Sequence, residues 1–218
     1  MEALVDLFLH LDTHLTEFVA TYGRWVYAFL FLIIFAETGL VVTPILPGDS
    51  LLFAAGALAA TGALDVRVLL VLLIVAAVLG DAVNYAAGNA VGPRIFRSID
   101  RTSWWQRMLN RDHLARAHEF FEKYGGKAIV LGRFVPIVRT FVPFVAGAGT
   151  MTYSSFALYN VSGAVIWVGV CTLGGYAFGN VPIVRDNFSL AALAIVGVSM
   201  LPIAVEYWKH RRNKQQTA

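Results

Sequence analysis

The segment that most constrains the fold of this chain runs from residue 132 to residue 147 and reads GRFVPIVRTFVPFVAG. It is apolar enough to lie in a bilayer, yet it contains two arginines and two prolines: Arg133, Pro136, Arg139 and Pro143. Proline interrupts backbone hydrogen bonding, and arginine is costly in hydrocarbon and is usually kept there for a function. A helix broken at membrane depth is tolerated only where protein or a water-filled cavity covers it. We therefore predict a re-entrant segment whose guanidinium groups face a polar cavity.

The composition places the rest of the chain in a membrane as well. The 218 residues are 58% hydrophobic and 14% charged, whereas soluble domains carry roughly 25% charged residues. We expect one integral membrane domain, and no cleaved signal peptide, because no basic segment followed by an apolar run opens the chain. A single cysteine, Cys171, excludes an internal disulfide and a multi-cysteine metal site. Neither a metal nor another cofactor is expected.

Basic residues gather in a connector at 92–127 and in the tail after residue 208. Their members are Arg94, Arg97, Arg101, Arg107, Arg111, Arg116, Lys123, Lys127, Lys209, Arg211, Arg212 and Lys214. Because basic loops beside membrane spans remain in the cytoplasm, we place both stretches on that face. Contact with anionic lipid headgroups explains this charge better than nucleic-acid binding does.

Hydropathy divides the chain into an amphipathic N-terminal helix (1–22), a first half (25–90), the basic connector (92–127), a second half (128–180) and a final span (187–208). In the first half, an apolar run ends at a break containing Pro47 and Gly48, where Asp49 or Ser50 is positioned to cap the next helix. The next apolar run, Leu51 to Ala60, is only about half a bilayer long. Residues 66–90 are long enough to cross. This order predicts a re-entrant hairpin followed by a span, and it leaves the side of the N-terminus open.

The two halves repeat each other at an offset of 91 residues. FAAG at 53–56 matches FVAG at 144–147, and YAAGN at 85–89 matches YAFGN at 176–180. Because the charged connector does not cross, the second unit enters the membrane inverted. We therefore predict an all-α membrane protein built from two inverted repeats, each a re-entrant hairpin plus a transmembrane helix. Such repeats of broken helices are typical of transporters with a site near the midplane. Chance similarity between small-residue membrane helices is the alternative.

Five charges lie at apparent membrane depth: Glu37, Asp49, Asp81, Arg133 and Arg139. Planar guanidinium groups suit a phosphate or a carboxylate. Glu37 and Asp49 are the candidates for proton coupling, because a carboxylate between a low-dielectric site and arginines can take and release a proton. The alternative is a set of salt bridges that only joins two hairpins.

Other polar residues suit more than one role on sequence alone. Asp81 and Asn84 fit helix packing as well as a site, and Asn160 is placed to bond across helices. Trp167 is interpreted as a packing residue or an interfacial anchor. A membrane phosphatase is the enzymatic alternative, but it would want a nucleophile or a histidine near the arginines, and no histidine is there. We do not expect an enzyme.

Several motifs together resemble the DedA family of bacterial membrane proteins over most of the chain. They are ETG at 37–39, LPGDSLLF at 46–53, GDAVNY at 80–85, the segment 132–147, MTY at 151–153, and Phe156, Asn160, Gly163 and Trp167. The resemblance implies two re-entrant hairpins in opposed repeats, as in VTT-domain lipid scramblases. It implies essential acids at Glu37 and Asp49 and essential arginines at Arg133 and Arg139. Supporting roles fall to Pro47, Gly48, Asp81, Asn84, Tyr85, Pro136, Pro143 and Asn160.

The resemblance also implies a function. Family members are associated with returning undecaprenyl phosphate to the cytoplasmic leaflet, others with phospholipid flipping, and activity is linked to the proton motive force. We therefore expect a proton-linked translocase of a polyprenyl phosphate in the bacterial cytoplasmic membrane, with the bilayer, the lipid, protons and a further copy of the chain as partners. A phospholipid scramblase, a proton-coupled small-ion or drug transporter and a non-transporting assembly factor are the alternatives.

Overall fold

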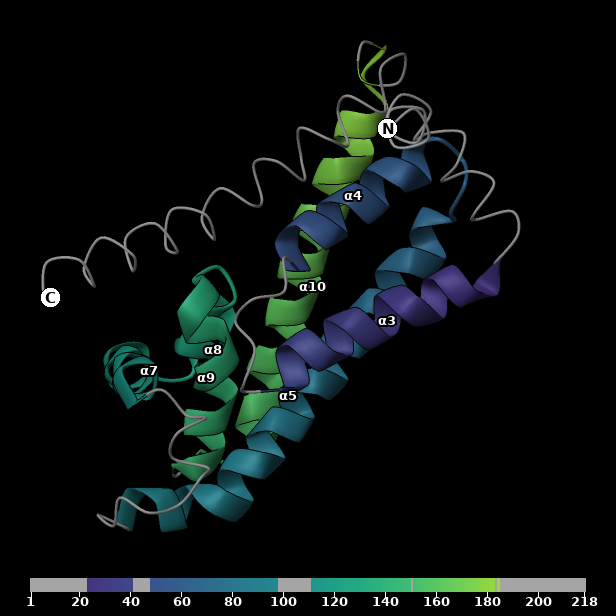
Figure 1. The fold of residues 1–218 in the computed structure, drawn as a ribbon. Helices are drawn as coiled ribbons and strands as arrows, with labels where there is room; N and C mark the ends of the chain where they lie inside the picture. Colours follow the sequence, from purple (N-terminus) through teal and green to yellow (C-terminus); the bar gives the residue numbers. More distant parts are fainter. Residues whose placement is uncertain (1–22, 41–47, 98–110, 150, 183, 185–218) are drawn as a thin grey trace, which may run out of the picture. The chain divides into compact units, whose positions relative to one another are not determined.

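The computed structural model describes residues 23–40, 48–97, 111–149, 151–182 and 184 (Figure 1). Their helices are α3 (Arg24–Gly39), α4 (Gly48–Ala60), α5 (Val66–Arg97), α7 (Arg111–Tyr124), α8 (Lys127–Gly132), α9 (Pro136–Ala148) and α10 (Tyr153–Gly179). These residues contain no strand, in agreement with the all-α prediction. The predicted N-terminal helix (1–22) and final span (187–208), together with Pro47, lie outside the described residues.

Two helices are long and apolar enough to cross a bilayer, Val66–Ala90 of α5 and Tyr153–Gly179 of α10. At about 1.5 Å per residue they measure about 38 and 40 Å, which exceeds the roughly 30 Å of bilayer hydrocarbon. Only 33% and 39% of their most apolar windows are buried. Large apolar side chains remain exposed along one stripe of each helix: Val71, Val75, Leu79 and Val83, and Leu158, Val161, Val165 and Leu173. A core helix of a soluble protein would bury such stripes, so these faces fit lipid.

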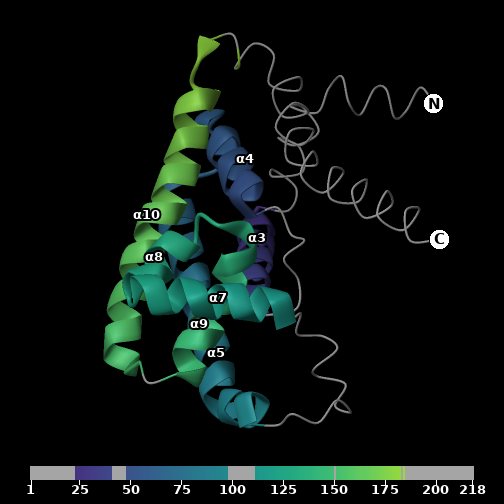
Figure 2. The ribbon, with the colours of Figure 1, turned by 90° about the vertical axis from the view of Figure 1, so that its left-hand side faces the viewer.

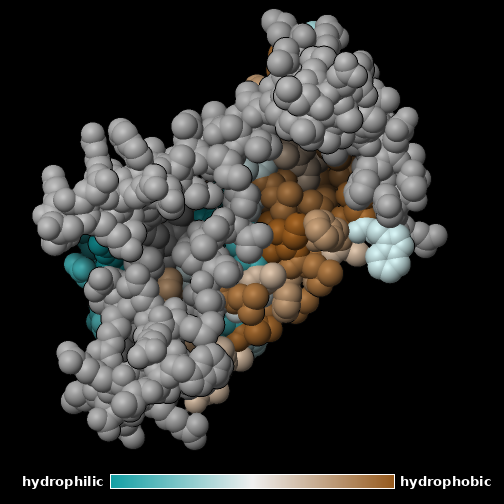
Figure 3. Space-filling view, viewed as in Figure 1, coloured by the Kyte–Doolittle hydropathy of each residue, from teal (hydrophilic) through white to brown (hydrophobic). Residues whose placement is uncertain are grey.

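Two shorter apolar helices precede α5, and the second lies where a half-length segment was expected. With 16 residues and 13 residues, α3 and α4 span only about 24 and 20 Å. The predicted cap before α4 is wrong, because the helix already begins at Gly48 and Asp49 lies in its first turn. A carboxylate there still complements the helix dipole. Hydrophobic side chains cover much of α3 in the view of Figure 3, and Trp25 and Phe29 are among its exposed residues.

The arginine-bearing segment is broken once. It leaves α8 at Gly132 and enters α9 at Pro136. Val135 is extended, with φ −113° and ψ 105°, as a residue before proline prefers. Pro136 occupies the first turn of α9, where a missing N–H costs nothing. Pro143, in contrast, lies buried inside α9 without ending it. Pro143 lacks an N–H to donate and yet does not end the helix, so the segment is broken before Pro136 and not at Pro143.

The chain forms two compact units, each described here by itself. The first comprises residues 1–26, 47–69 and 171–218, and the second comprises residues 27–46 and 70–170. In the first unit, α4 packs tightly on the end of α10. A Cβ on Gly56 would lie 2.0 Å from the carbonyl oxygen of Thr172, and one on Gly175 would lie 2.0 Å from that of Phe53. The absence of side chains at these glycines is what lets the two backbones touch.

In the second unit, α9 packs on α5 by the same device. A Cβ on Gly88 would lie 2.1 Å from the carbonyl oxygen of Phe144, and one on Gly147 would lie 2.0 Å from that of Tyr85. The Tyr85 ring stacks on Phe156 of α10 at 4.4 Å between centroids, within the buried core of this unit. These contacts hold α9 at a fixed height along α5.

The basic connector contains the helix α7, which runs across α8 and α9 (Figure 2). Ala117 is fully buried, and Phe121 packs against the core of the second unit. On the opposite face Arg116, Glu119 and Lys123 are exposed. Helix α5 continues to Arg97, seven residues beyond the predicted end of its span at residue 90, because the basic connector begins as helix.

Candidate functional site

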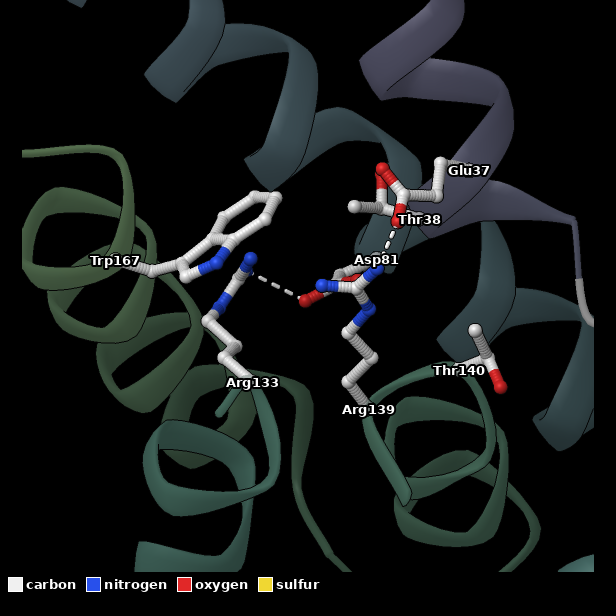
Figure 4. A pocket seen from close by; sticks show the side chains of 7 residues that line it. All are labelled: Glu37, Thr38, Asp81, Arg133, Arg139, Thr140 and Trp167. Atoms are coloured by element: carbon white, nitrogen blue, oxygen red, sulfur yellow. Dashed lines mark hydrogen bonds and ion pairs between the residues drawn. The ribbon is translucent and has the colours of Figure 1, made fainter. Parts of the chain in front are cut away.

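A small cavity lies inside the second unit, where four helices and the α8–α9 link converge (Figure 4). Its lining residues are Glu37 and Thr38 of α3, Asp81 of α5, Arg133 of the link, Arg139 and Thr140 of α9, and Trp167 of α10. Three of the four residues expected to hold substrate or protons are therefore brought together by segments far apart in the sequence. The volume is about 10 Å³, room for about one water molecule.

Arg133 is held by a carboxylate and an amide. Its Nη2 donates to Asp81 Oδ2 at 2.6 Å and to Asn160 Oδ1 at 2.7 Å. The Arg133 and Asp81 side chains are 5% and 4% exposed, so this is a buried ion pair with little access to water. Asn160 in turn donates to the carbonyl of Val78 at 3.1 Å, which fixes its amide. The expected bond from Asn160 across helices is thus present, with Arg133 as its partner.

The Arg133 side chain fits because α10 has a glycine beside it. A Cβ on Gly163 would lie 3.1 Å from Arg133 Nε and 3.2 Å from its Cδ. That Nε is buried and has no hydrogen-bond partner in the structure. The Nε–H of Arg133 therefore remains available as a hydrogen-bond donor while Nη2 binds Asp81 and Asn160.

Arg139 forms the second ion pair of the cavity, with Glu37 Oε1. Glu37 is 1% exposed, and the pair joins α9 to α3. Because Pro136 fixes the start of α9, Arg139 occupies the first turn of that helix, where its N–H bonds to the Val135 carbonyl at 3.0 Å. Glu37 and Arg139 were both predicted as site residues, and the structure places them in direct contact.

Trp167 lies against both arginines. The guanidinium carbons of Arg133 and Arg139 are each 5.6 Å from the centroid of its indole ring. The side chain is 1% exposed, so it is not an interfacial anchor. A ring face attracts a cation, and here one ring serves two. In Figure 4 the two arginine side chains extend into the cavity from one side, with the Asp81 carboxylate between their guanidinium groups.

The two acids are positioned by a close crossing of α3 and α5. A Cβ on Gly39 would lie 3.3 Å from the Gly80 backbone, so the helices touch next to Glu37 and Asp81. Asn84, fully buried one turn further along α5, donates to the carbonyls of Thr38 at 3.2 Å and Thr140 at 2.7 Å. It joins three helices and does not itself line the cavity.

The remaining predicted residues lie elsewhere. Asp49 is in α4, within the first unit, so its association with the arginines stays a prediction. Gly48 is buried at the start of α4, whereas Tyr85 and Pro143 belong to the packed interior of the second unit. Tyr85 donates from its hydroxyl to the Met151 carbonyl.

Sequence reasoning missed three lining residues, Thr38, Thr140 and Trp167. Both threonines directly follow predicted site residues in the sequence. Trp167 lies seven residues after Asn160, two helical turns along the same face of α10. That spacing was the available signal. The lining residues include no histidine and no cysteine, so the chemistry they offer is anion binding by two arginines and proton exchange on two carboxylates.

Comparison with known proteins gives the family. The VTT domain model matches residues 46–177. Protein DedA of Escherichia coli (strain K12) is 52% identical over 217 residues, covering 99% of this chain and 97% of that protein. The uncharacterized membrane protein Rv0364 of Mycobacterium tuberculosis (strain ATCC 25618 / H37Rv) is 42% identical over 201 residues, covering 90% and 86%.

A further relative is the inner membrane protein YqjA of Escherichia coli (strain K12), 38% identical over 157 residues, covering 72% of this chain and 69% of the relative. No solved structure matches the chain at a significant level. The VTT match spans more than half of the sequence, and the similarity to protein DedA runs over nearly all of it. This chain therefore belongs to the DedA family of VTT-domain membrane proteins.

Proposed function

We propose that this protein translocates a phosphate-bearing lipid, a polyprenyl phosphate such as undecaprenyl phosphate, across the bacterial cytoplasmic membrane with proton coupling. The observation that carries the proposal is the convergence of two guanidinium groups, that of Arg133 buried and that of Arg139 largely buried, on one ring in a small cavity. Buried arginine is expensive in a membrane protein and marks a substrate or ion pathway. Its planar set of donors matches a phosphate group.

In this mechanism Arg133 and Arg139 hold the phosphate while the hydrocarbon tail stays in lipid. The tail must remain outside because the cavity, at about 10 Å³, is too small even for the headgroup. The structure therefore corresponds to a closed arrangement, and loading requires the carboxylates to move away from the arginines. Glu37 and Asp49 take up protons in this step, as the family resemblance implies.

Inverted repeats are part of the same proposal, and the packing inside each unit supports them. In the first unit Gly56 of α4 packs on the α10 backbone, and in the second Gly147 of α9 packs on the α5 backbone. These two glycines are 91 residues apart, the offset of the sequence repeat. Each short apolar helix is thus joined to the long helix of the opposite half, as expected for two re-entrant hairpins that alternate about a fixed site. With the basic connector and the C-terminus in the cytoplasm, the two halves enter the membrane from opposite sides.

Leaflet-resolved transport in proteoliposomes tests this function. A fluorescent polyprenyl phosphate is added to vesicles, and its movement between leaflets is followed by a quencher that does not cross. We expect Arg139→Ala and Asp49→Ala to abolish the movement, and Arg139→Lys to impair it because an ammonium group cannot make the bidentate contact. Arg116→Ala, on the exposed face of α7, is the matched control. Equal rates in Arg139→Ala and the unchanged protein would refute the assignment.

A proton-coupled small-ion transporter is the second candidate, favoured by the small size of the cavity, which is nearer to that of an ion than of a lipid headgroup. Ion flux and lipid movement, each measured at an imposed pH gradient with and without the lipid, separate the two. Lipid-independent ion flux that depends on Arg139 supports the second candidate. A variant with all four predicted charges neutralised can also be expressed in cells that lack the protein. Full restoration of their growth by this variant would instead indicate an assembly factor without transport activity.

A further inference from the structure

Asp81 occupies the position on Arg133 that a substrate oxygen would take. Its Oδ2 lies 2.6 Å from Arg133 Nη2, and both side chains are almost fully buried. Carboxylate and phosphate oxygens bind guanidinium with the same charge-assisted geometry. Arg133 is therefore already occupied by an anion of the protein, and a phosphate must compete with it.

The charges of the cavity balance before any substrate enters. Glu37 belongs to α3. The charged groups that face it are Asp81 of α5, Arg133 of the α8–α9 link and Arg139 of α9, while α10 contributes the uncharged Asn160 and Trp167. With every group ionised, two positive and two negative charges cancel. A buried phosphate adds one or two negative charges, and uncompensated burial of charge is strongly unfavourable. Neutrality is restored when the carboxylates take up protons.

The Arg133 guanidinium group is held by further contacts besides its ion pair with Asp81. Its Nη2 also bonds to Asn160 Oδ1 at 2.7 Å, and its guanidinium group lies over the Trp167 ring. Asn160 is itself tied to the α5 backbone. The loss of one acceptor thus leaves the guanidinium oriented and a donor available.

Resting on the proposed function, we propose that Asp81 is the internal counter-ion of Arg133, and that protonation of Asp81 allows Arg133 to bind the phosphate. Each arginine then has its own acid, Glu37 for Arg139 and Asp81 for Arg133. A headgroup with one negative charge enters with one proton, and a headgroup with two negative charges enters with two. Only O–H bonds change: each protonated carboxylate gains a proton that hydronium in the water at the loading side gives up.

Proton uptake on ligand binding tests this assignment. The probe is farnesyl phosphate, a short polyprenyl phosphate soluble in detergent, with farnesol as the uncharged control. Full-length protein in weakly buffered detergent solution is mixed with each probe, and a pH dye counts the protons taken up per ligand bound. The unchanged protein, Asp81→Asn and the control Glu122→Gln, whose side chain is exposed on α7, are compared.

Asp81→Asn should take up about one proton fewer than the unchanged protein at the same pH. For each unit by which the pH rises, the affinity of Asp81→Asn for farnesyl phosphate should fall about tenfold less than that of the unchanged protein. At alkaline pH, Asp81→Asn should therefore bind the probe more tightly than the unchanged protein does. Because the probe's own titration is common to all three proteins, the difference belongs to Asp81. Glu122→Gln should match the unchanged protein. Equal proton uptake and equal pH dependence in Asp81→Asn would overturn the inference.

Failure of the proposed function gives a different result, since the unchanged protein then binds farnesyl phosphate no better than farnesol. Should Asp81→Asn not fold, the infrared difference spectrum of the unchanged protein on binding provides the second measurement. If Asp81 takes up a proton beside the two acids already proposed, the protonated-carboxyl band persists in the double variant Glu37→Gln, Asp49→Asn. Its complete loss in that double variant would assign all proton uptake to Glu37 and Asp49 and refute the role of Asp81.

Discussion

Gly80 of α5 lies directly against Thr38 of α3, so that a Cβ on Gly80 would come within 1.9 Å of Thr38 Oγ1. Thr38 cannot easily turn aside, because its hydroxyl donates to the Ile34 carbonyl at 2.9 Å. Each of the two residues is next in sequence to an acid of the cavity, Asp81 and Glu37. The distance between these helices thus sets the distance between the two carboxylates.

Replacing Gly80 by alanine should push α3 away from α5. The new methyl group would also lie 2.9 Å from the Phe35 carbonyl oxygen, which belongs to the backbone and cannot rotate away. We expect a loss of about 1–3 kcal/mol in stability, the usual cost of overpacking, and a lower flip rate. Thermal unfolding in detergent measures the first. Gly169→Ala on α10, where nothing lies within 4 Å of the added Cβ, should be neutral or stabilise by up to about 1 kcal/mol. A similar response of both variants would contradict the crossing described.

Asn84→Leu should destabilise the second unit without changing any residue that lines the cavity. The substitution removes two donated bonds, to the Thr38 and Thr140 carbonyls, and leaves both acceptors buried. Hydrogen bonds between membrane helices contribute about 0.6–2 kcal/mol, so a loss of about 1–3 kcal/mol follows. Asn89→Leu, at an exposed position of the same helix, should leave the unfolding temperature unchanged. An equal temperature for Asn84→Leu and the unchanged protein would show that the bonds contribute nothing.

Trp167 should be replaceable by phenylalanine but not by leucine. Phenylalanine keeps an aromatic face for the arginines, whereas leucine fills space without one. A desolvated cation–π contact contributes about 1–2 kcal/mol, so Trp167→Leu should weaken farnesyl phosphate binding roughly tenfold or more. Trp25→Leu, at an exposed position of α3, is the control. The role of the ring would be disproved by leucine and phenylalanine variants that bind equally well.

Gly56→Ala and Gly147→Ala should lower the unfolding temperature by similar amounts. In each case the added Cβ would lie 2.0 Å from a backbone carbonyl oxygen of the neighbouring long helix, and neither backbone can yield without a shift. An overpacking cost of about 1–3 kcal/mol is expected for each. Additive losses in the double variant, measured by the same thermal unfolding, would fit two separate helix pairs. A large effect of one and none of the other would count against equivalent roles in two repeats.

Much of the helix pattern could be predicted from the sequence, because membrane spans need about 20 apolar residues and leave a clear signal. The spans of α5 and α10 and the break before Pro136 were found in this way. Pro143 behaved differently, since its effect depends on packing around α9 that no local rule contains. The burial of Glu37 and of Arg133 also followed from their apolar surroundings.

The pairing of charges could not be predicted. On sequence alone, Asp81 fitted a packing role and a site role equally well. Its contact with Arg133 depends on how closely α3 and α5 approach at Gly39 and Gly80, a distance that no sequence pattern specifies. Trp167 was interpreted as a packing residue or an interfacial anchor. Only the folded arrangement shows that the ring lies against two cations.

The one-water cavity has an electrical consequence. Leakage of ions or protons through a membrane protein needs a continuous file of water or of exchangeable groups. A space of about 10 Å³, bordered by two closed ion pairs, interrupts such a file at this point. Moving one charge through a membrane potential of 100 mV releases about 2.3 kcal/mol. A site of this kind that stayed open would therefore dissipate the membrane potential of the cell. A site closed in this way would limit the leakage of ions.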